Sequence, residues 1–202
     1  MEVYAARQPI FDRSMNIYGY ELLYRRSSNN YYEGINDKQA TAELINNAYL
    51  VIQLNDLTGG TRAFINFSEE LLVKEIPLLL PKEGIVVEVL ERVKPTADVI
   101  NACKKLKKFG YKLALDDFVF DGSYLPLIEI ADIIKVEYPA LDPNQQHQMI
   151  EQYQRQYSLK FLAEKIETRE EHQTALALGY DFFQGYFFSK PVIVKGAIPV
   201  MN

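Results

Sequence analysis

The feature that most constrains the fold is a regular alternation of strand-like and helix-like segments between Arg62 and Gln184. Short apolar runs rich in β-branched residues, such as 62–67, 84–91 and 111–115, each lead through a short connection into a segment with helical spacing. Alternation of this kind implies a parallel sheet. Counted with two further strands near the N-terminus, the strands number about eight, which favours a barrel over an open sheet.

The first 25 residues follow a different pattern. Residues 3–11 and 17–25 are strand-like and are separated by a turn-like stretch from Asp12 to Asn16, so we expect an antiparallel hairpin. A Gly-Gly turn is predicted over 56–61, and the tail from Pro191 is rich in Val and Ile. The longer predicted helices cover residues 38–54, 95–109, 144–157 and 169–178.

Length and composition bound the class of protein. The chain has 202 residues, enough for one sizeable core, so a single domain over 1–202 is expected. The net charge of −5 gives no general affinity for a nucleic-acid polymer. The single cysteine, Cys103, suits a small apolar helix position, and no secretory signal or membrane-length apolar stretch is visible. These features predict a cytoplasmic protein that does not span a membrane.

Polar residues recur where the predicted strands end. Asp116 and Asp117 directly follow an apolar strand, and two adjacent carboxylates in that position need a cation, a proton or a basic partner. In a barrel of parallel strands these ends converge on the catalytic face. The residues at or near strand ends are Glu21, Asn66, Glu88, Asp116, Asp117, Lys135, Glu164 and Gln184.

This set of side chains predicts a metal site. Five carboxylates and two amides suit one or two Mg²⁺ or Mn²⁺ ions, and the scarcity of His and Cys argues against zinc. A carboxylate-rich metal site with one lysine suits phosphodiester hydrolysis. Each residue also has a purely structural interpretation. Glu21 could face outward, Asn66 could serve a turn, and Lys135 could pair with Glu137 or Asp132; the recurrence at six strand ends favours the site.

Seven segments, spread in order over nearly the whole chain, form a recognisable series. They are 20–25 (YELLYR), 65–68 (INFS), 88–91 (EVLE), 115–118 (LDDF), 135–137 (KVE), 163–168 (AEKIET) and 184–191 (QGYFFSKP). Together they resemble the motifs of the EAL domain family. The resemblance implies a modified TIM-type (β/α)₈ barrel, somewhat trimmed, whose first strand is antiparallel. It also implies cyclic di-GMP phosphodiesterase activity, opening the dinucleotide to linear pGpG with Mg²⁺ or Mn²⁺. The opening segment 6–11 (ARQPIF) resembles the EAL portion of EAL/HDOD signalling proteins, although no HDOD domain is expected within these residues.

The resemblance also implies a role for each matching residue. Metal ligands would be Glu21, Asn66, Glu88 and Asp116, with Asp117 and Glu164 serving a second metal or bridging. Lys135 would hold the catalytic water. The catalytic residues implied by the resemblance are Glu21, Asp117, Lys135 and Glu164. The substrate would meet Leu23, Arg25 and Gln184, and Glu91 would anchor the loop after Asp117.

Departures from the family pattern bear on activity. The loop after the acidic pair reads Phe118-Val119-Phe120-Asp121-Gly122, without two glycines that are usual there. This departure predicts a bacterial signalling module of cyclic di-GMP pathways with weak or absent turnover. The alternatives are a fully active phosphodiesterase and a catalytically inert module that binds other signalling proteins. Aromatic residues in and beside this loop (Phe118, Phe120 and Tyr124) favour a homodimer.

Overall fold

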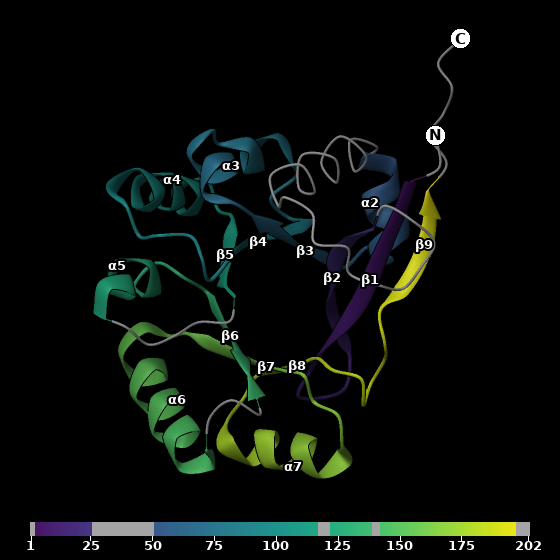
Figure 1. The fold of residues 1–202 in the computed structure, drawn as a ribbon, viewed down its shortest axis with the longest axis vertical. Helices are drawn as coiled ribbons and strands as arrows, with labels where there is room; N and C mark the ends of the chain where they lie inside the picture. The colour runs from purple at the N-terminus through teal and green to yellow at the C-terminus, as the bar shows by residue number, and fades with distance from the viewer. Residues whose placement is uncertain (1–2, 26–50, 117–121, 139–141, 197–202) are drawn as a thin grey trace.

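A computed structural model describes residues 3–25, 51–116, 122–138 and 142–196, and it contains one continuous sheet (Figure 1). The first two strands, β1 (Val3–Asp12) and β2 (Ile17–Arg25), are antiparallel and face each other along most of their length. The following strands run parallel from β2 onward: β3 (Arg62–Phe67), β4 (Ile85–Val89), β5 (Lys112–Leu115), β6 (Ile133–Glu137), β7 (Lys160–Glu164) and β8 (Phe182–Phe183).

The sheet closes because β1 pairs with β2 on one side and with β8 on the other. Phe11 lies opposite Phe183 in the antiparallel β1–β8 pair. The predicted barrel with an antiparallel first strand is therefore confirmed. A further strand, β9 (Val192–Gly196), lies antiparallel to the N-terminal half of β1, so the Val- and Ile-rich tail contributes a strand that had not been predicted.

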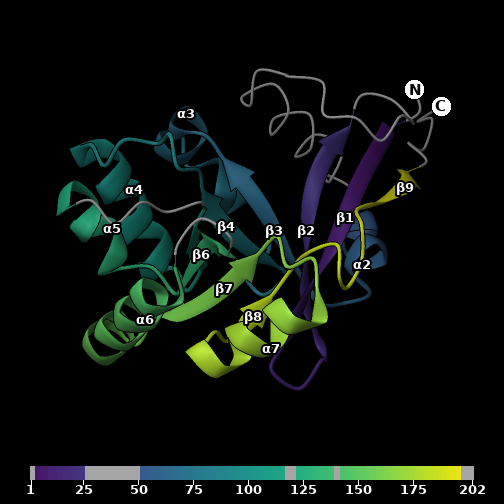
Figure 2. The same ribbon diagram turned by 60° about the horizontal axis from the view of Figure 1, so that its bottom comes forward.

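Helices lie outside the strands and cover the barrel (Figures 1 and 2). Several begin at side-chain caps: Thr96 precedes α4, Asp142 precedes α6, and Thr168 forms a reciprocal capping box with Glu171 at the start of α7. The helical segments are α2 (Val51–Thr58), α3 (Glu69–Val73), η1 (Ile76–Leu79), α4 (Ala97–Lys108), η2 (Gly122–Tyr124), α5 (Leu125–Ile128), α6 (Pro143–Tyr157) and α7 (Arg169–Leu178).

The helix predicted over 38–54 needs a correction at its C-terminal end. Its described part continues to Thr58, and the predicted turn over 56–61 is confined to Gly59 and Gly60, both with positive φ. The Thr58 hydroxyl donates to the carbonyl of Leu54, which keeps the last turn helical until the glycines end it. Residues 38–50 of that predicted helix lie outside the described residues.

Two apolar layers stabilise the barrel. The larger layer lies between the outward faces of the strands and the helices, and it contains Cys103, whose burial raises the pKa of its thiol to about 12. This placement confirms Cys103 as a small apolar helix position. The smaller layer, called the inner layer below, fills the inside of the barrel. Its buried members are Ile10, Phe64, Val86, Ala114, Ile133, Leu162 and Phe182, with Tyr18 packed against them.

Tyr18 and Gly19 complete the inner layer. The Tyr18 ring stacks on Phe182 at 4.2 Å between centroids and meets Phe64 edge-on. A Cβ atom on Gly19 would come within 3.0 Å of the Phe64 ring and 2.7 Å of the Arg62 carbonyl oxygen. Glycine at this position therefore leaves room for the large Phe64 ring inside the barrel.

Candidate active site

The inner face of the barrel changes from apolar to polar within two residues on each parallel strand. Because successive side chains of a strand point to opposite faces, residues two apart share the inner face. The inner-layer residues and the polar residues that follow them are Phe64 and Asn66, Val86 and Glu88, Ala114 and Asp116, Ile133 and Lys135, Leu162 and Glu164, and Phe182 and Gln184. The local sequence thus places one polar side chain per strand above the inner apolar layer.

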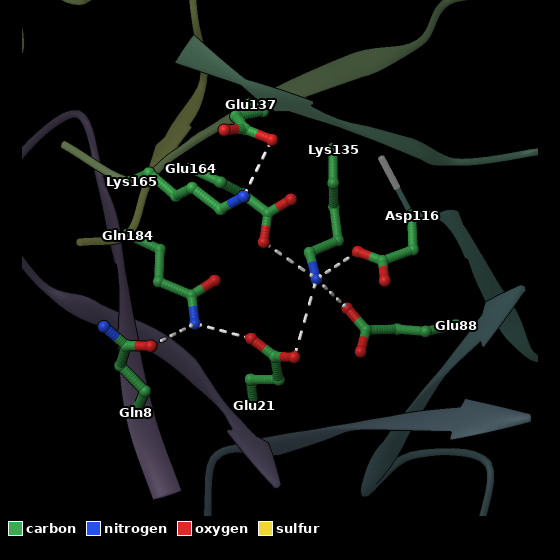
Figure 3. Close-up of polar contacts among 9 residues, drawn as sticks. All are labelled: Gln8, Glu21, Glu88, Asp116, Lys135, Glu137, Glu164, Lys165 and Gln184. Carbon is green, nitrogen blue, oxygen red and sulfur yellow. Dashed lines mark hydrogen bonds and ion pairs between the residues drawn. The ribbon is translucent and has the colours of Figure 1, made fainter. Parts of the chain in front are cut away.

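Lys135 lies at the centre of these polar side chains (Figure 3). Its side chain is 1% exposed, and its ammonium forms ion pairs with four carboxylates that lie on or directly after four different strands. The Nζ atom lies 2.6 Å from Asp116 Oδ1, 2.8 Å from Glu88 Oε1, 3.0 Å from Glu164 Oε1 and 3.8 Å from Glu21 Oε1. The structural alternative, pairing with Glu137 or Asp132, is wrong, since Glu137 pairs with Lys165 and Asp132 with Lys107.

The charges of the site are not balanced. Four carboxylates surround one ammonium, so the cluster carries excess negative charge when all groups are ionised. Burial by itself lowers the pKa of Lys135, but the surrounding carboxylates together raise that pKa well above its ordinary value. Burial raises the pKa of the fully buried Glu88 well above its ordinary value, although Lys135 opposes this shift. The site therefore favours an additional cation.

Glu21 is held by a second set of contacts. It is 8% exposed and points into the barrel, so the alternative of an outward-facing Glu21 is wrong. Its Oε2 atom accepts a hydrogen bond of 2.6 Å from Gln184 Nε2, and the same nitrogen lies 3.2 Å from Gln8 Oε1. Gln8, on β1 and 8% exposed, is a site residue that the sequence reasoning missed.

A sequence signal for Gln8 exists. The prediction searched the C-terminal ends of strands, whereas the antiparallel β1 brings its N-terminal half to the same end of the barrel. Gln8 precedes the inner-layer residue Ile10 by two, in mirror image of the parallel strands. The predicted hairpin was therefore sufficient to identify Gln8.

The loops after β7 and β8 are joined through their backbones. Ile166 N donates to the carbonyl of Gln184 (3.1 Å), and Phe187 N donates to the carbonyl of Ile166 (3.0 Å). A Cβ atom on Gly185 would lie 2.0 Å from the Ile166 carbonyl oxygen, so only glycine allows this approach. Lys165, directly after Glu164, has a φ of 58°, an uncommon conformation for a residue with a side chain. These contacts fix Glu164 and Gln184 relative to each other.

A cavity of about 400 Å³ opens above the cluster. Leu23 is half-buried and lines this cavity. Gly185, Tyr186 and Pro191 also line the cavity, and Tyr186 is 58% exposed. The cavity walls also include Gln8, Glu21, Asp116, Glu164 and Gln184, so the charged cluster is open to a ligand from this side.

Some predicted site residues are not brought into the cluster. Asp117 lies outside the described residues, and so does the side chain of Arg25, the last residue of β2. The side chain of Glu91 is exposed, and its backbone carbonyl accepts a hydrogen bond of 3.3 Å from the Tyr124 hydroxyl. The predicted anchoring role of Glu91 stays a prediction, because residues 117–121 of the loop are not described.

The donor set fits a hard divalent cation. Within the described ranges, no three acidic, histidine or cysteine side chains are already arranged to hold a metal ion, since the ammonium of Lys135 lies where the oxygens converge. Glu88 Oε2 is buried and accepts no hydrogen bond from the described residues, which leaves an oxygen available to a cation. Carboxylate and amide oxygens without histidine or cysteine suit Mg²⁺ or Mn²⁺.

Comparison with known proteins reveals close relatives. The chain is 41% identical over 201 residues to the protein YuxH of Bacillus subtilis, covering 97% of this chain and 49% of that protein. It is 40% identical over 194 residues to the cyclic di-GMP phosphodiesterase CdgJ of Vibrio cholerae, covering 95% of this chain and 45% of that protein. The chain thus spans about half the length of these relatives.

A solved structure has the same fold. BlrP1 of Klebsiella pneumoniae, in its complex with calcium and cyclic di-GMP, superposes with a TM-score of 0.75 at 23% identity, covering 95% of this chain and 56% of that one. No helix in the described part of this chain is long and apolar enough to cross a membrane. The EAL domain model matches residues 2–191, and the chain therefore belongs to the EAL domain family.

Proposed function

We propose that this domain hydrolyses cyclic di-GMP to linear pGpG in the presence of Mg²⁺ or Mn²⁺. The observation that carries the proposal is the convergence of four carboxylates on the buried Lys135 at the open end of the barrel. The 40% identity to the cyclic di-GMP phosphodiesterase CdgJ supports both the substrate and the reaction. The BlrP1 complex gives further support, because that protein has the same fold and its structure contains both calcium and cyclic di-GMP.

The proposal assigns roles to the clustered side chains. The cation would be held by Glu21, Asn66, Glu88 and Asp116, with Asp117 and Glu164 serving a second ion or bridging. A bound divalent cation supplies charge neutralisation at the phosphate and lowers the pKa of the attacking water. Lys135 holds the water and stabilises the developing negative charge with its ammonium. Arg25 and Gln184 contact the substrate, with Leu23 beside it in the cavity wall.

The relatives support the active alternative over the module with weak or absent turnover. That weaker reading rested on the loop that begins at Phe118, whose residues up to Asp121 lie outside the described part of the chain. By contrast, the described carboxylates and Lys135 already meet in one cluster. A catalytically inert role in binding other signalling proteins has no specific observation in its favour. Homodimer formation and a cytoplasmic location stay predictions.

Hydrolysis of cyclic di-GMP with Mn²⁺, followed by separation of the nucleotides, tests this function. We expect Glu21→Ala to reduce turnover by about 100-fold or more, because it removes a cation ligand. Glu151→Ala is the matched control, since Glu151 lies on α6 and forms an ion pair with Arg155 at the protein surface. Calorimetric binding in Ca²⁺ separates the readings: binding without turnover in Mn²⁺ would leave a sensor module and contradict the proposed enzyme.

A further inference from the structure

We propose that Gln8 is a positioning residue that fixes the orientation of the Gln184 side-chain amide and, through it, the Glu21 carboxylate. The proposal rests on the proposed function only in taking Glu21 to be a ligand of a divalent cation. Gln8 lies in none of the motifs that carry the metal ligands. Its role follows from three hydrogen bonds that link β1, the loop after β8, and β2. Figure 3 shows the two that join Gln8, Gln184 and Glu21.

The three hydrogen bonds form one directed chain. Gln8 Nε2 donates to the backbone carbonyl of Ser189 (3.0 Å). Gln8 Oε1 accepts from Gln184 Nε2 (3.2 Å), and that nitrogen also donates to Glu21 Oε2 (2.6 Å). The residues Gln8, Gln184 and Glu21 are 8%, 3% and 8% exposed.

The direction of the chain is set at the Ser189 carbonyl. A carbonyl oxygen only accepts, so it requires the NH₂ group of Gln8 and turns the oxygen of Gln8 toward Gln184. Gln184 must then present its own NH₂ group, which is also what the Glu21 carboxylate needs. A reversed Gln184 amide would place its oxygen against both Gln8 Oε1 and Glu21 Oε2. Both ends of the chain thus favour the same orientation.

This orientation has two consequences for the site. Glu21 receives a short hydrogen bond on Oε2, which leaves Oε1 directed toward Lys135 at 3.8 Å. The oxygen of Gln184 is left buried and accepts no hydrogen bond from the described residues. Since Gln184 lines the cavity, that oxygen is an acceptor for a donor supplied by a ligand or a cation-bound water. Gln8 and Glu21 together therefore determine which atom of Gln184 a ligand meets.

Gln8 contacts Glu21 through an intermediary. In the β1–β2 register Gln8 lies directly opposite Glu21. The Gln8 NH₂ group donates to the Ser189 carbonyl, and the Gln8 oxygen accepts from Gln184. Gln184 is this intermediary, because it contributes a donor that both Gln8 and Glu21 accept. Gln8 consequently acts on the cation ligand through Gln184.

A double-mutant cycle on Mn²⁺ affinity tests the proposal. Titration calorimetry on the full chain without nucleotide would compare the parent, Gln8→Met, Gln184→Met and the double variant. Methionine keeps the length of glutamine and removes both polar atoms. We expect Gln8→Met to weaken Mn²⁺ binding about tenfold, as is typical for residues that orient metal ligands. In the Gln184→Met background, Gln8→Met should have no further effect. Fold losses that multiply in the double variant would overturn the proposal.

Gln146→Met is the matched control for losing a buried amide. Gln146 is 1% exposed, donates to the Tyr138 carbonyl (2.9 Å) and accepts from the Tyr180 hydroxyl (2.7 Å), outside the polar cluster. We expect it to lower the midpoint of thermal unfolding while leaving Mn²⁺ affinity unchanged. Unchanged Mn²⁺ affinity in Gln8→Met would contradict the positioning role.

A metal-free readout separates this proposal from the proposed function. In ¹⁵N-labelled protein, the side-chain NH₂ signals of Gln184 should show protons that exchange slowly with water, about tenfold or more slower than in Gln8→Met. Unchanged signals and exchange would overturn the positioning role whether or not Mn²⁺ binds. If Mn²⁺ binds without hydrolysis of cyclic di-GMP, the proposed function fails, while the cycle still decides the role of Gln8.

Discussion

The carboxylates at the two ends of the barrel differ in how they are neutralised and hydrogen-bonded. At the end where the parallel strands begin, called the lower end here, Asp132 accepts a hydrogen bond from the backbone N of Leu113 (2.8 Å) and pairs with Lys107 (2.6 Å). Asp181 likewise accepts from the backbone N of Phe161 (3.0 Å) and pairs with Lys160 (2.8 Å). At the other end four carboxylates share Lys135, and Glu88 Oε2 accepts no hydrogen bond from the described residues.

This difference separates stability from function within one sheet. Each acid at the lower end has its own amide and its own lysine, so nothing further is needed to hold it. At the upper end, which is the end that holds Lys135, four carboxylates share one ammonium and lie beside an open cavity. In barrels of this kind the carboxyl ends of the strands carry function and the amino ends carry stability. Here the distinction follows from how the carboxylates are neutralised.

Removing Lys135 should have the largest effect. Lys135→Met takes the ammonium from four carboxylates, and loss of one partner of a buried ion pair costs about 3–5 kcal/mol of unfolding free energy. We expect a loss of this size in urea unfolding at neutral pH without divalent cations, and a smaller loss with Mn²⁺ present. A loss below about 1 kcal/mol would show that the upper carboxylates do not depend on the lysine.

A substitution at the lower end should cost stability alone. Asp132→Ala leaves the buried N–H of Leu113 unsatisfied and removes the pair with Lys107, which costs about 1–3 kcal/mol of unfolding free energy. The turnover of cyclic di-GMP per folded molecule should not change. Asp132→Asn is the control, because its amide oxygen still accepts from Leu113 N. A fall in turnover with Asp132→Ala would break the separation between the two ends.

The smallest effect should be a change in the pH dependence of stability. Glu88 has a folded pKa well above its ordinary value of 4.5, so between these values the folded state binds more protons than the unfolded state. The stability that Glu88 contributes is then present below pH 4.5 and is lost as the pH rises through its folded pKa. We expect Glu88→Gln to remove this decline in metal-free protein, measured as unfolding free energy against pH. An unchanged slope would show that Glu88 titrates normally.

The sequence predicted which polar residues follow the inner apolar layer on the parallel strands. Periodicity placed β3 to β8 in order, and the polar residue after each apolar strand identified Asn66, Glu88, Asp116, Lys135, Glu164 and Gln184. This worked because a side chain two residues beyond a buried one must share its face, whatever the helices outside do. The barrel itself followed from the same alternation of strands and helices.

The parts that escaped prediction depend on long-range contacts. Gln8 was missed for a different reason: only the C-terminal ends of strands were considered, although the predicted hairpin already gave the direction of β1. The pairing of β9 with β1 joins residues nearly 190 positions apart, which local periodicity does not reveal. The sequence also predicted that a cation would neutralise the acids but did not foresee Lys135 as their shared counter-ion. Such sharing depends on side chains from four strands meeting at one point.

The inner apolar layer limits the side from which a ligand can reach the polar cluster. Phe64, Phe182 and Tyr18 close the base of the barrel, and the absence of a side chain at Gly19 lets the Phe64 ring complete that closure. Within the described residues, this layer separates the cavity above the polar cluster from the opposite end of the barrel. Under the proposed function, a substrate and its product would therefore both pass on the cavity side, where Tyr186 and Pro191 lie.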